Sequence, residues 1–190
     1  MRPFRKNPHT QSPLTAERTA NGAFSYYIDM RVIEYNRGAA FAYAKMWAFR
    51  RNPRFYNFDG LGGDCTNLAS QCIYAGAGIM NYTHTFGWYY KDLNNRAPAW
   101  TGVEYLYNFM TTNEGKGPFA EGTPLNKLEV GDIVQLGTAT GDFYHSPVVV
   151  AVREGRIYVA AHTFDAFMRP LSSYSFARAR GIHILGVRSE

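Results

Sequence analysis

The sequence predicts an α+β fold, with N-terminal helices packed on an antiparallel sheet or half-barrel. Apolar residues recur at helical spacing in the first part of the 190-residue chain. After a stretch rich in glycine and proline, residues 115–124, the character changes to short runs typical of strands. Glu154-Gly155 separates two of these runs and suits a hairpin turn. Helices followed by an antiparallel meander indicate the α+β class.

One domain is expected, because 190 residues suit a single hydrophobic core better than two. Residues 1–22 are polar, rich in Pro, Thr and Asn, and without periodicity, which predicts a flexible N-terminal arm. We therefore assign the single domain to residues 23–190.

Two of the three predicted helices follow from apolar periodicity alone. Residues 35–50 carry apolar side chains at helical spacing, and Asn52-Pro53 supplies the stop. Residues 100–110 show the same spacing. The stretch between 77 and 98, with glycine, asparagine, threonine and aromatic residues, is interpreted as an irregular connection.

The remaining helix is predicted from its end signals. Gly62-Gly63 is a turn, after which Asp64 can cap a helix through its side chain. The helix is expected to run through Tyr74 and to end at Gly76, since glycine favours the left-handed conformation found there. Four strands are expected later in the chain, over residues 132–136, 146–153, 156–162 and 182–187.

The charge distribution argues against a nucleic-acid partner. The chain has 20 Lys and Arg against 15 Asp and Glu, a net charge of +5. These basic residues do not gather along one element, which favours a mildly basic solvated surface.

No window approaches the roughly 18 uninterrupted apolar residues of a membrane helix, so no integral membrane segment is expected. Residues 1–22 also lack the apolar core of a signal peptide.

The two cysteines, Cys65 and Cys72, are expected to be free thiols. Seven residues on a helix separate their Cα atoms by roughly 10 Å, whereas a disulfide requires less than about 7 Å. Cys65 opens the predicted helix, where unpaired N–H groups and the helix dipole favour the thiolate, the nucleophilic form. Cys72 lies in the last part of the helix and is interpreted as a core residue.

His145 is the best candidate for a base that activates Cys65. It precedes a predicted strand and follows a loop, so a rigid sheet can aim it at a helix start packed nearby. His162 ends the neighbouring strand, about 4.8 Å away, where it can orient the base. Asp165 is the alternative third member. Asp64 is expected to be a structural cap, not an acid or base. The other histidines have surface, strand or arm positions: His9, His84 and His183.

A longer motif surrounds these residues, and its specific part is Gly62-Gly63-Asp64-Cys65-Thr66-Asn67 with Ser70-Gln71. Further matching positions are Tyr35-Asn36-Arg37, Trp47, Trp88, Trp100-Thr101-Gly102-Val103, Gly131-Asp132, His145-Ser146 and His162-Thr163. Over residues 35–171 the chain resembles the bacterial putative amidase domain family, which is related to the NlpC-type and CHAP-type cell-wall hydrolases. It departs from the family pattern at Leu68-Ala69 and at Phe55.

The resemblance implies a papain-like (NlpC/CHAP-type) fold and a cysteine hydrolase that cleaves an amide bond. The implied catalytic residues are Cys65, His145 and His162, and the implied substrate is a peptidoglycan peptide or a similar peptide. No metal or cofactor is required by this chemistry. Family relatives favour an extracellular or cell-wall location. The sequence leaves two alternatives: an acyl or peptidyl transferase that uses the same nucleophile, and a catalytically silent wall-binding module.

Overall fold

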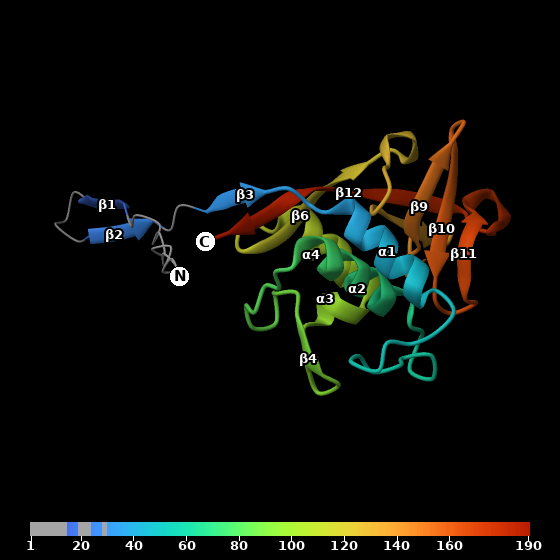
Figure 1. Cartoon of the computed structure of the whole chain (residues 1–190), viewed down its shortest axis with the longest axis horizontal. Coiled ribbons are helices and arrows are strands. Elements are labelled where there is room, and N and C mark those ends of the chain that lie inside the picture. The colour runs from blue at the N-terminus through green and yellow to red at the C-terminus, as the bar shows by residue number, and fades with distance from the viewer. Residues whose placement is uncertain (1–14, 19–23, 28–29) are drawn as a thin grey trace, which may run out of the picture.

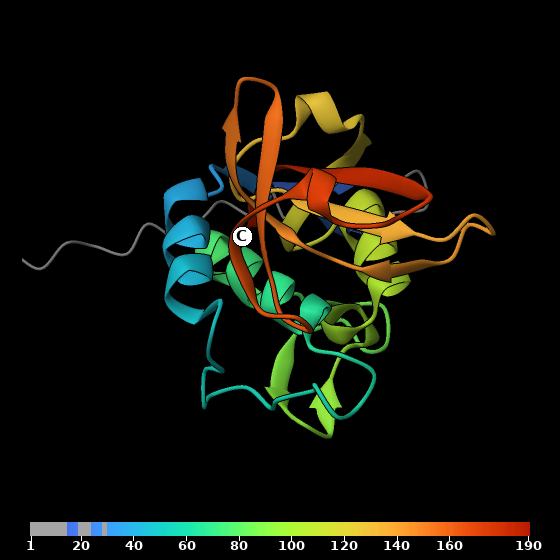
Figure 2. The ribbon, with the colours of Figure 1, turned by 90° about the vertical axis from the view of Figure 1, so that its right-hand side faces the viewer.

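The computed structural model describes residues 15–18, 24–27 and 30–190 and has an α+β fold (Figure 1). Eight strands form one curled antiparallel sheet with the order β11-β10-β9-β7-β12-β3, while β6 pairs with β12 and β8 with β7. The helices gather on one side of this sheet, as the two perpendicular views show (Figures 1 and 2). The predicted α+β class, with helices on an antiparallel half-barrel, is confirmed.

The strands of the sheet are β3 (Arg31–Ile33), β6 (Gly117–Thr123), β7 (Ile133–Gly137), β8 (Phe143–His145), β9 (Val148–Arg153), β10 (Arg156–Ala161), β11 (Ala166–Pro170) and β12 (Arg178–Ser189). The helices are α1 (Arg37–Trp47), α2 (Cys65–Ala77), α3 (Pro98–Thr101) and α4 (Val103–Thr112). Two separate hairpins are β1 (Thr15–Arg18) with β2 (Phe24–Tyr27), and β4 (Tyr90–Asp92) with β5 (Asn95–Arg96).

Strand β12 pairs with three other strands of the sheet. It pairs with β7 through its first half, with β6 through its middle and second half, and with β3 at residues 187–189. The predicted strand at 182–187 is therefore longer than expected. The predicted hairpin is also present, because β9 pairs with β10 through Arg153 and Arg156. Glu154 and Gly155 both have positive φ angles, 50° and 73°, the conformation that a tight hairpin turn of this kind requires.

Helix α2 begins at Cys65, as predicted, but it does not end at Gly76. The helix continues to Ala77, and Gly78 is the left-handed cap, with φ 67° and its N–H donating to the Tyr74 carbonyl. Gly76 serves a different purpose: a Cβ there would lie 2.3 Å from the Tyr35 ring. A glycine is therefore required at position 76 because two chain segments approach closely there, and not because the helix ends there.

The predicted helix over residues 100–110 is two helices, α3 and α4, separated by Gly102. This residue has extended backbone angles, φ −102° and ψ 129°, so the chain turns between the two helices.

Strand β6 was not predicted from the sequence, and Gly122 shows why. Glycine and proline suggested a loop, yet a Cβ at Gly122 would lie 2.5 Å from the Tyr107 hydroxyl. Glycine in β6 therefore lets α4 lie directly against the sheet.

The polar residues of the α2 motif are buried and fix the helix among aromatic side chains. The Trp100 indole N–H donates to Asn67 Oδ1 at 2.8 Å, and that of Trp88 donates to Ser70 Oγ at 3.0 Å. The Tyr43 hydroxyl donates to Gln71 at 2.7 Å. Each buried polar group is thus satisfied. The motif is largely explained by these contacts, which hold the start of α2 in a defined position.

Only part of the predicted N-terminal arm falls on described residues. Thr15–Arg18 forms β1 and pairs antiparallel with β2, whereas residues 1–14 and 19–22 lie outside the described part. The boundary at residue 22 therefore stays a prediction. Among the helices of the described residues, none combines the length and the apolar character needed to cross a bilayer.

Candidate active site

Cys65 and His145 line the same pocket, although they come from distant parts of the sequence. Cys65 is the first residue of α2, and His145 is the last residue of β8. The pocket has a volume of about 380 Å³. Its other lining residues are Gly62, Tyr144, Thr163, Phe164, Arg169, Tyr174 and Ser175. The structure thus places a thiol and an imidazole on one cavity, and their roles as nucleophile and base stay a prediction.

The Cys65 thiol is nearly buried, with a relative exposure of 7%. Burial raises the pKa of Cys65 above its ordinary value, and the charge of Asp64 acts in the same direction. Hydrogen bonds from the Ser146 backbone and from Thr66 oppose that shift without cancelling it. The helix start was expected to lower this pKa, and the shift has the opposite direction because the desolvation of a thiolate outweighs these hydrogen bonds.

Cys72 differs from Cys65 in having no access to the pocket. It is completely buried in the hydrophobic core, and burial alone raises the pKa of its thiol far above the ordinary value. Both cysteines are free, as the spacing along the helix predicted. The interpretation of Cys72 as a core residue is confirmed.

His145 is neutral at physiological pH. Burial lowers its pKa to about 4, and the positive charge of Arg169 contributes to the shift. Its ring lies beside that of Tyr174, with centroids 5.7 Å apart. Within residues 30–190 no hydrogen bond joins His145 to Cys65 or to any other side chain. A neutral imidazole and a neutral thiol on the same pocket do not form an ion pair in this state.

His162 is not among the residues that line this pocket, and both of its ring nitrogens have other partners. Its Nδ1 is 2.5 Å from Asp64 Oδ2, and its Nε2 is 2.8 Å from the Trp47 carbonyl oxygen. A carbonyl oxygen only accepts, so Nε2 donates to it. The structure does not bring His162 to His145, and the predicted contact between these two rings is absent.

Asp64 is the centre of a buried polar cluster. Its carboxylate accepts hydrogen bonds from the Phe58 backbone at 2.9 Å and from Asn67 at 2.8 Å. The Arg51 guanidinium lies 3.5 Å away. Asp64 occupies the N-cap position of α2, as predicted, but its side chain makes no capping bond to the backbone of the helix, so that part of the prediction is wrong. Instead, the side chain of Asp64, the residue before Cys65, contacts His162.

Asp165, the alternative third member of a triad, pairs with Arg51 at 2.8 Å. A hydrogen bond from that guanidinium lowers the pKa of Asp165. Neither candidate for the third position therefore contacts His145. The remaining described histidines lie elsewhere: His84 is exposed and contacts Thr85, and His183 pairs with Asp132. His9 lies outside the described residues.

Several residues of the pocket escaped the sequence analysis. Arg169 lies on β11, and Tyr174 follows the short turn after that strand. The sequence analysis did not predict this strand. Thr163 accepts a hydrogen bond from the Asp64 backbone at 3.0 Å, and its position after His162 in the family motif was the one available sign. The described residues contain no group of three or more His, Cys, Asp or Glu side chains suited to a metal ion.

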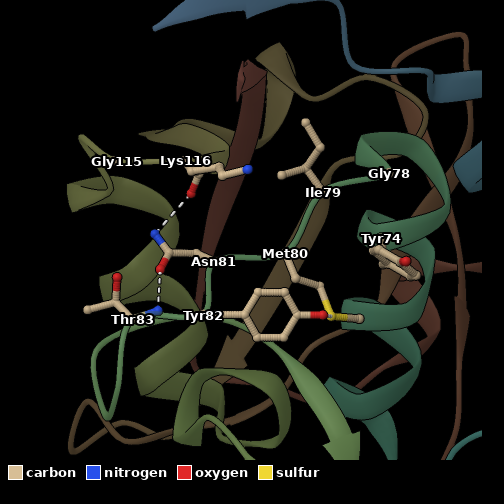
Figure 3. Close-up of a pocket in the computed structure, with 9 residues that line it drawn as sticks. All are labelled: Tyr74, Gly78, Ile79, Met80, Asn81, Tyr82, Thr83, Gly115 and Lys116. Atoms are coloured by element: carbon tan, nitrogen blue, oxygen red, sulfur yellow. Dashed lines mark hydrogen bonds between the residues drawn. The ribbon is translucent and has the colours of Figure 1, made fainter. Parts of the chain in front are cut away.

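A second, larger hollow of about 600 Å³ lies near the C-terminal end of α2 (Figure 3). The Asn81 side chain at its floor donates to the Lys116 carbonyl at 2.9 Å and accepts from the Thr83 backbone at 2.9 Å. Its lining has no cysteine, histidine or carboxylate side chain. The Cys65 pocket, which is lined by both a thiol and an imidazole, is therefore the better candidate for catalysis despite its smaller volume.

Comparisons with known proteins concern the family of the chain and not its catalytic residues. An uncharacterized protein of Bacillus subtilis (strain 168), YhbB, is 29% identical over 143 residues, which is 73% of this chain and 45% of that protein. The chain thus spans less than half the length of this relative. No solved structure matches the chain. The putative amidase domain family matches residues 34–185. Since this match covers most of the chain, the protein belongs to the putative amidase domain family.

Proposed function

We propose that the protein is a cysteine amidase in which Cys65 is the nucleophile and His145 the general base. The single observation that carries the proposal is the shared pocket: elements separated by about 80 residues place a thiol and a neutral imidazole on one cavity. Membership of the putative amidase family supports the hydrolase class. Accessibility supports Cys65 over Cys72, because only Cys65 reaches a cavity.

The charge states define how the reaction begins. With the pKa of Cys65 raised and that of His145 lowered, the resting pair is thiol and imidazole. His145 removes the thiol proton as the sulfur attacks the amide carbonyl, so a C–S bond forms while charge develops on the carbonyl oxygen. The unpaired Cys65 N–H at the start of α2 is positioned to donate to that oxygen.

Collapse of the tetrahedral intermediate breaks the C–N bond, and His145 gives its proton to the departing amine. Water then attacks the thioester while His145 accepts its proton, and that proton passes to the sulfur as the C–S bond breaks and the carboxylic acid leaves. His162 takes no part in these proton transfers. We assign it a positioning role: with Asp64 and the Trp47 carbonyl, it fixes the backbone immediately before the nucleophile.

A peptide amide of the bacterial cell wall is the proposed substrate, and a papain-like fold of the NlpC or CHAP type remains a prediction from the sequence resemblance. A transferase would form the same thioester but pass it to an amine. Products that incorporate an added amine would identify that reaction. A silent binding module would leave amide bonds intact.

Digestion of purified peptidoglycan, followed by mass analysis of the fragments, tests the proposal. We expect new termini at amide bonds with the wild-type protein and none with Cys65→Ala. Cys72→Ala is the matched control, since it removes the other thiol from the same helix. It should retain activity and lose about 1 to 2 kcal/mol of stability through the cavity it creates. Equal loss of activity in both variants at equal stability would refute the assignment of the nucleophile.

A further inference from the structure

The pocket at Cys65 contains one charged residue, Arg169, and no acidic one. His145 is neutral, as described above, so the guanidinium is the only net charge on the lining. Aromatic side chains make up much of the remaining wall and rim: Tyr144, Phe164 and Tyr174. A cavity of this kind, with apolar walls and one fixed cation, favours an anionic group in its occupant.

The Arg169 side chain is fixed in place by its neighbours. Its Nε donates to Ser173 Oγ at 2.9 Å and its Nη2 to the Ser173 carbonyl at 3.3 Å. The guanidinium stacks on the Tyr174 ring, 4.0 Å from the ring centroid. These contacts hold the planar group in one orientation, so little side-chain entropy remains to be lost when a ligand binds.

Arg169 also lacks a partner of opposite charge. Three other arginines of the described residues, Arg37, Arg51 and Arg180, each pair with a carboxylate. No acidic side chain in the described residues forms a salt bridge with Arg169, and its Nη1 makes no hydrogen bond there. A guanidinium oriented by neutral groups presents its remaining N–H groups to a ligand, and a carboxylate matches their geometry.

Backbone strain is concentrated around the same pocket. Five non-glycine residues of the described part have positive φ angles, and Thr163, Phe164 and Met168 are three of them. Thr163 and Phe164 line the cavity. Met168 precedes Arg169, and the pairing of β10 with β11 is irregular here. An irregularity of this kind redirects the side chains next to it, and strained residues persist where the surroundings impose them.

We propose that Arg169 selects amide substrates that carry a carboxylate next to the scissile bond. The inference rests on the proposed amidase function and narrows its substrate class. A bound carboxylate has a second effect, because it neutralises the charge that helps to lower the pKa of His145. The substrate would thereby shift the base toward its ordinary pKa and improve it as a proton acceptor near neutral pH.

Alkylation of Cys65 by two reagents that differ in charge tests the pocket without requiring turnover. Iodoacetate and iodoacetamide react in the same way: the sulfur forms a bond to carbon, iodide leaves, and the thiol proton is released. We expect the rate of Cys65 alkylation by iodoacetate, divided by the rate with iodoacetamide, to fall about tenfold in Arg169→Gln. This factor corresponds to the loss of one ionic contact of modest strength. Arg169→Lys should keep part of the preference for iodoacetate.

Arg153→Gln is the matched control, because Arg153 is an exposed arginine at the end of β9, outside the pocket. It changes the net charge equally and should leave the ratio unchanged. Unfolding curves show whether each variant is folded at the labelling temperature. An equal ratio in the wild type, Arg169→Gln and Arg153→Gln would overturn the proposal, as would an equal decrease in both variants.

Peptide hydrolysis distinguishes the source of the carboxylate and separates this inference from the proposed function. One pair of peptides differs in a free or amidated C-terminus, and a second pair in glutamate or glutamine next to the cleaved bond. Preference for the acidic member of either pair, lost in Arg169→Gln, supports the inference and identifies the group. Equal cleavage of all four contradicts it but leaves the amidase intact. No cleavage together with a preserved iodoacetate preference contradicts the amidase alone.

Discussion

Two buried clusters of the same composition lie at opposite ends of helix α1. At its C-terminal end, Asp64 contacts His162 and Arg51, and His162 also binds the Trp47 carbonyl. At its N-terminal end, Asp132 contacts His183 and Arg37. Both aspartates are completely buried, and each histidine uses Nδ1 toward its aspartate. We refer to them as the Asp64 cluster and the Asp132 cluster.

The comparison teaches that an Asp–His contact is not by itself a sign of catalysis in this protein. The Asp132 cluster joins α1 to the sheet: Arg37 also donates to the Ile184 carbonyl at 2.8 Å, and the Ile184 N–H donates to Asp132 at 3.0 Å. It has no nucleophile beside it. The Asp64 cluster makes the same kinds of contact, but the residue after Asp64 is Cys65. Proximity to the pocket, and not the composition of the cluster, separates the two.

The largest expected effect comes from substituting the two buried aspartates. Asp64→Asn and Asp132→Asn should each lower the free energy of unfolding by about 3 to 5 kcal/mol, because each removes a completely buried carboxylate that pairs with an arginine and accepts several hydrogen bonds. Only Asp64→Asn should also change the alkylation rate of Cys65 measured under folded conditions. Urea unfolding and iodoacetamide labelling provide the two measurements. A similar change of the Cys65 rate in both variants would show that the Asp64 cluster has no special relation to the site.

The histidines of the two clusters each contact an aspartate, whereas His145 has no acidic partner among the described residues. The free energy of unfolding as a function of pH tests this difference. The pKa of His145 is about 4 in the folded protein and about 6.5 in an unfolded chain. Between these values the unfolded state binds more protons, so the free energy of unfolding falls as the pH falls from 6.5 to 4. His145 accounts for up to about 3 kcal/mol of that decrease. His145→Asn should remove this contribution, and the difference between the two stability profiles isolates it from titrating carboxylates. A constant difference across the window would contradict the shift.

Histidine substitutions are expected to have smaller effects. His162→Gln should cost about 1 to 3 kcal/mol, since His162 is buried and bonded at both nitrogens. It should also slow turnover by about tenfold by loosening the backbone before Cys65. A positioning role predicts that the pH dependence of the rate stays unchanged. His183→Gln, at a partly exposed position, should alter stability by about 1 kcal/mol and leave turnover intact. A displaced pH profile in His162→Gln would instead indicate direct participation in proton transfer.

The outer acidic residues of the two clusters provide the smallest effect. Asp59 pairs with Arg51 and Glu129 with Arg37, and their side chains are 39% and 60% exposed. Exposed ion pairs contribute little, so Asp59→Asn and Glu129→Gln should each change the free energy of unfolding by less than about 1 kcal/mol. Thermal unfolding at two salt concentrations measures this. A loss that approaches that of the buried aspartates would mean that the rim residues hold the clusters together.

Local signals predicted much of the fold. Periodicity and end signals located α1 and the start of α2, and the Glu154-Gly155 turn predicted the β9–β10 hairpin. These features depend on neighbouring residues, so a sequence contains them directly. Gly76 and Gly122 misled the analysis because their role is set by the approach of Tyr35 and Tyr107. Such tertiary contacts have no local sequence signal.

The candidate site was predictable to the same extent. A helix start at Cys65 and a histidine beside a strand sufficed to propose the nucleophile and base, and both line the pocket. The partners of His162 were not predictable, because they lie 98 and 115 positions away in the chain. The direction of the Cys65 pKa shift was also missed, since burial depends on the assembled fold. Arg169 lies on a strand that had no recognisable alternation.

The pairing of β12 with three other strands has a consequence for the synthesis of the protein. Ribosomes deliver residues in order, and β12 (Arg178–Ser189) pairs with β3, β6 and β7, which are all made earlier. Until residues 178–189 have left the exit tunnel, those strands expose unpaired edges that can join other chains. Folding must wait for contacts between segments far apart in the sequence, which slows it. The nascent chain therefore passes through an aggregation-prone interval, and shielding by a chaperone during translation would be of most use in that interval.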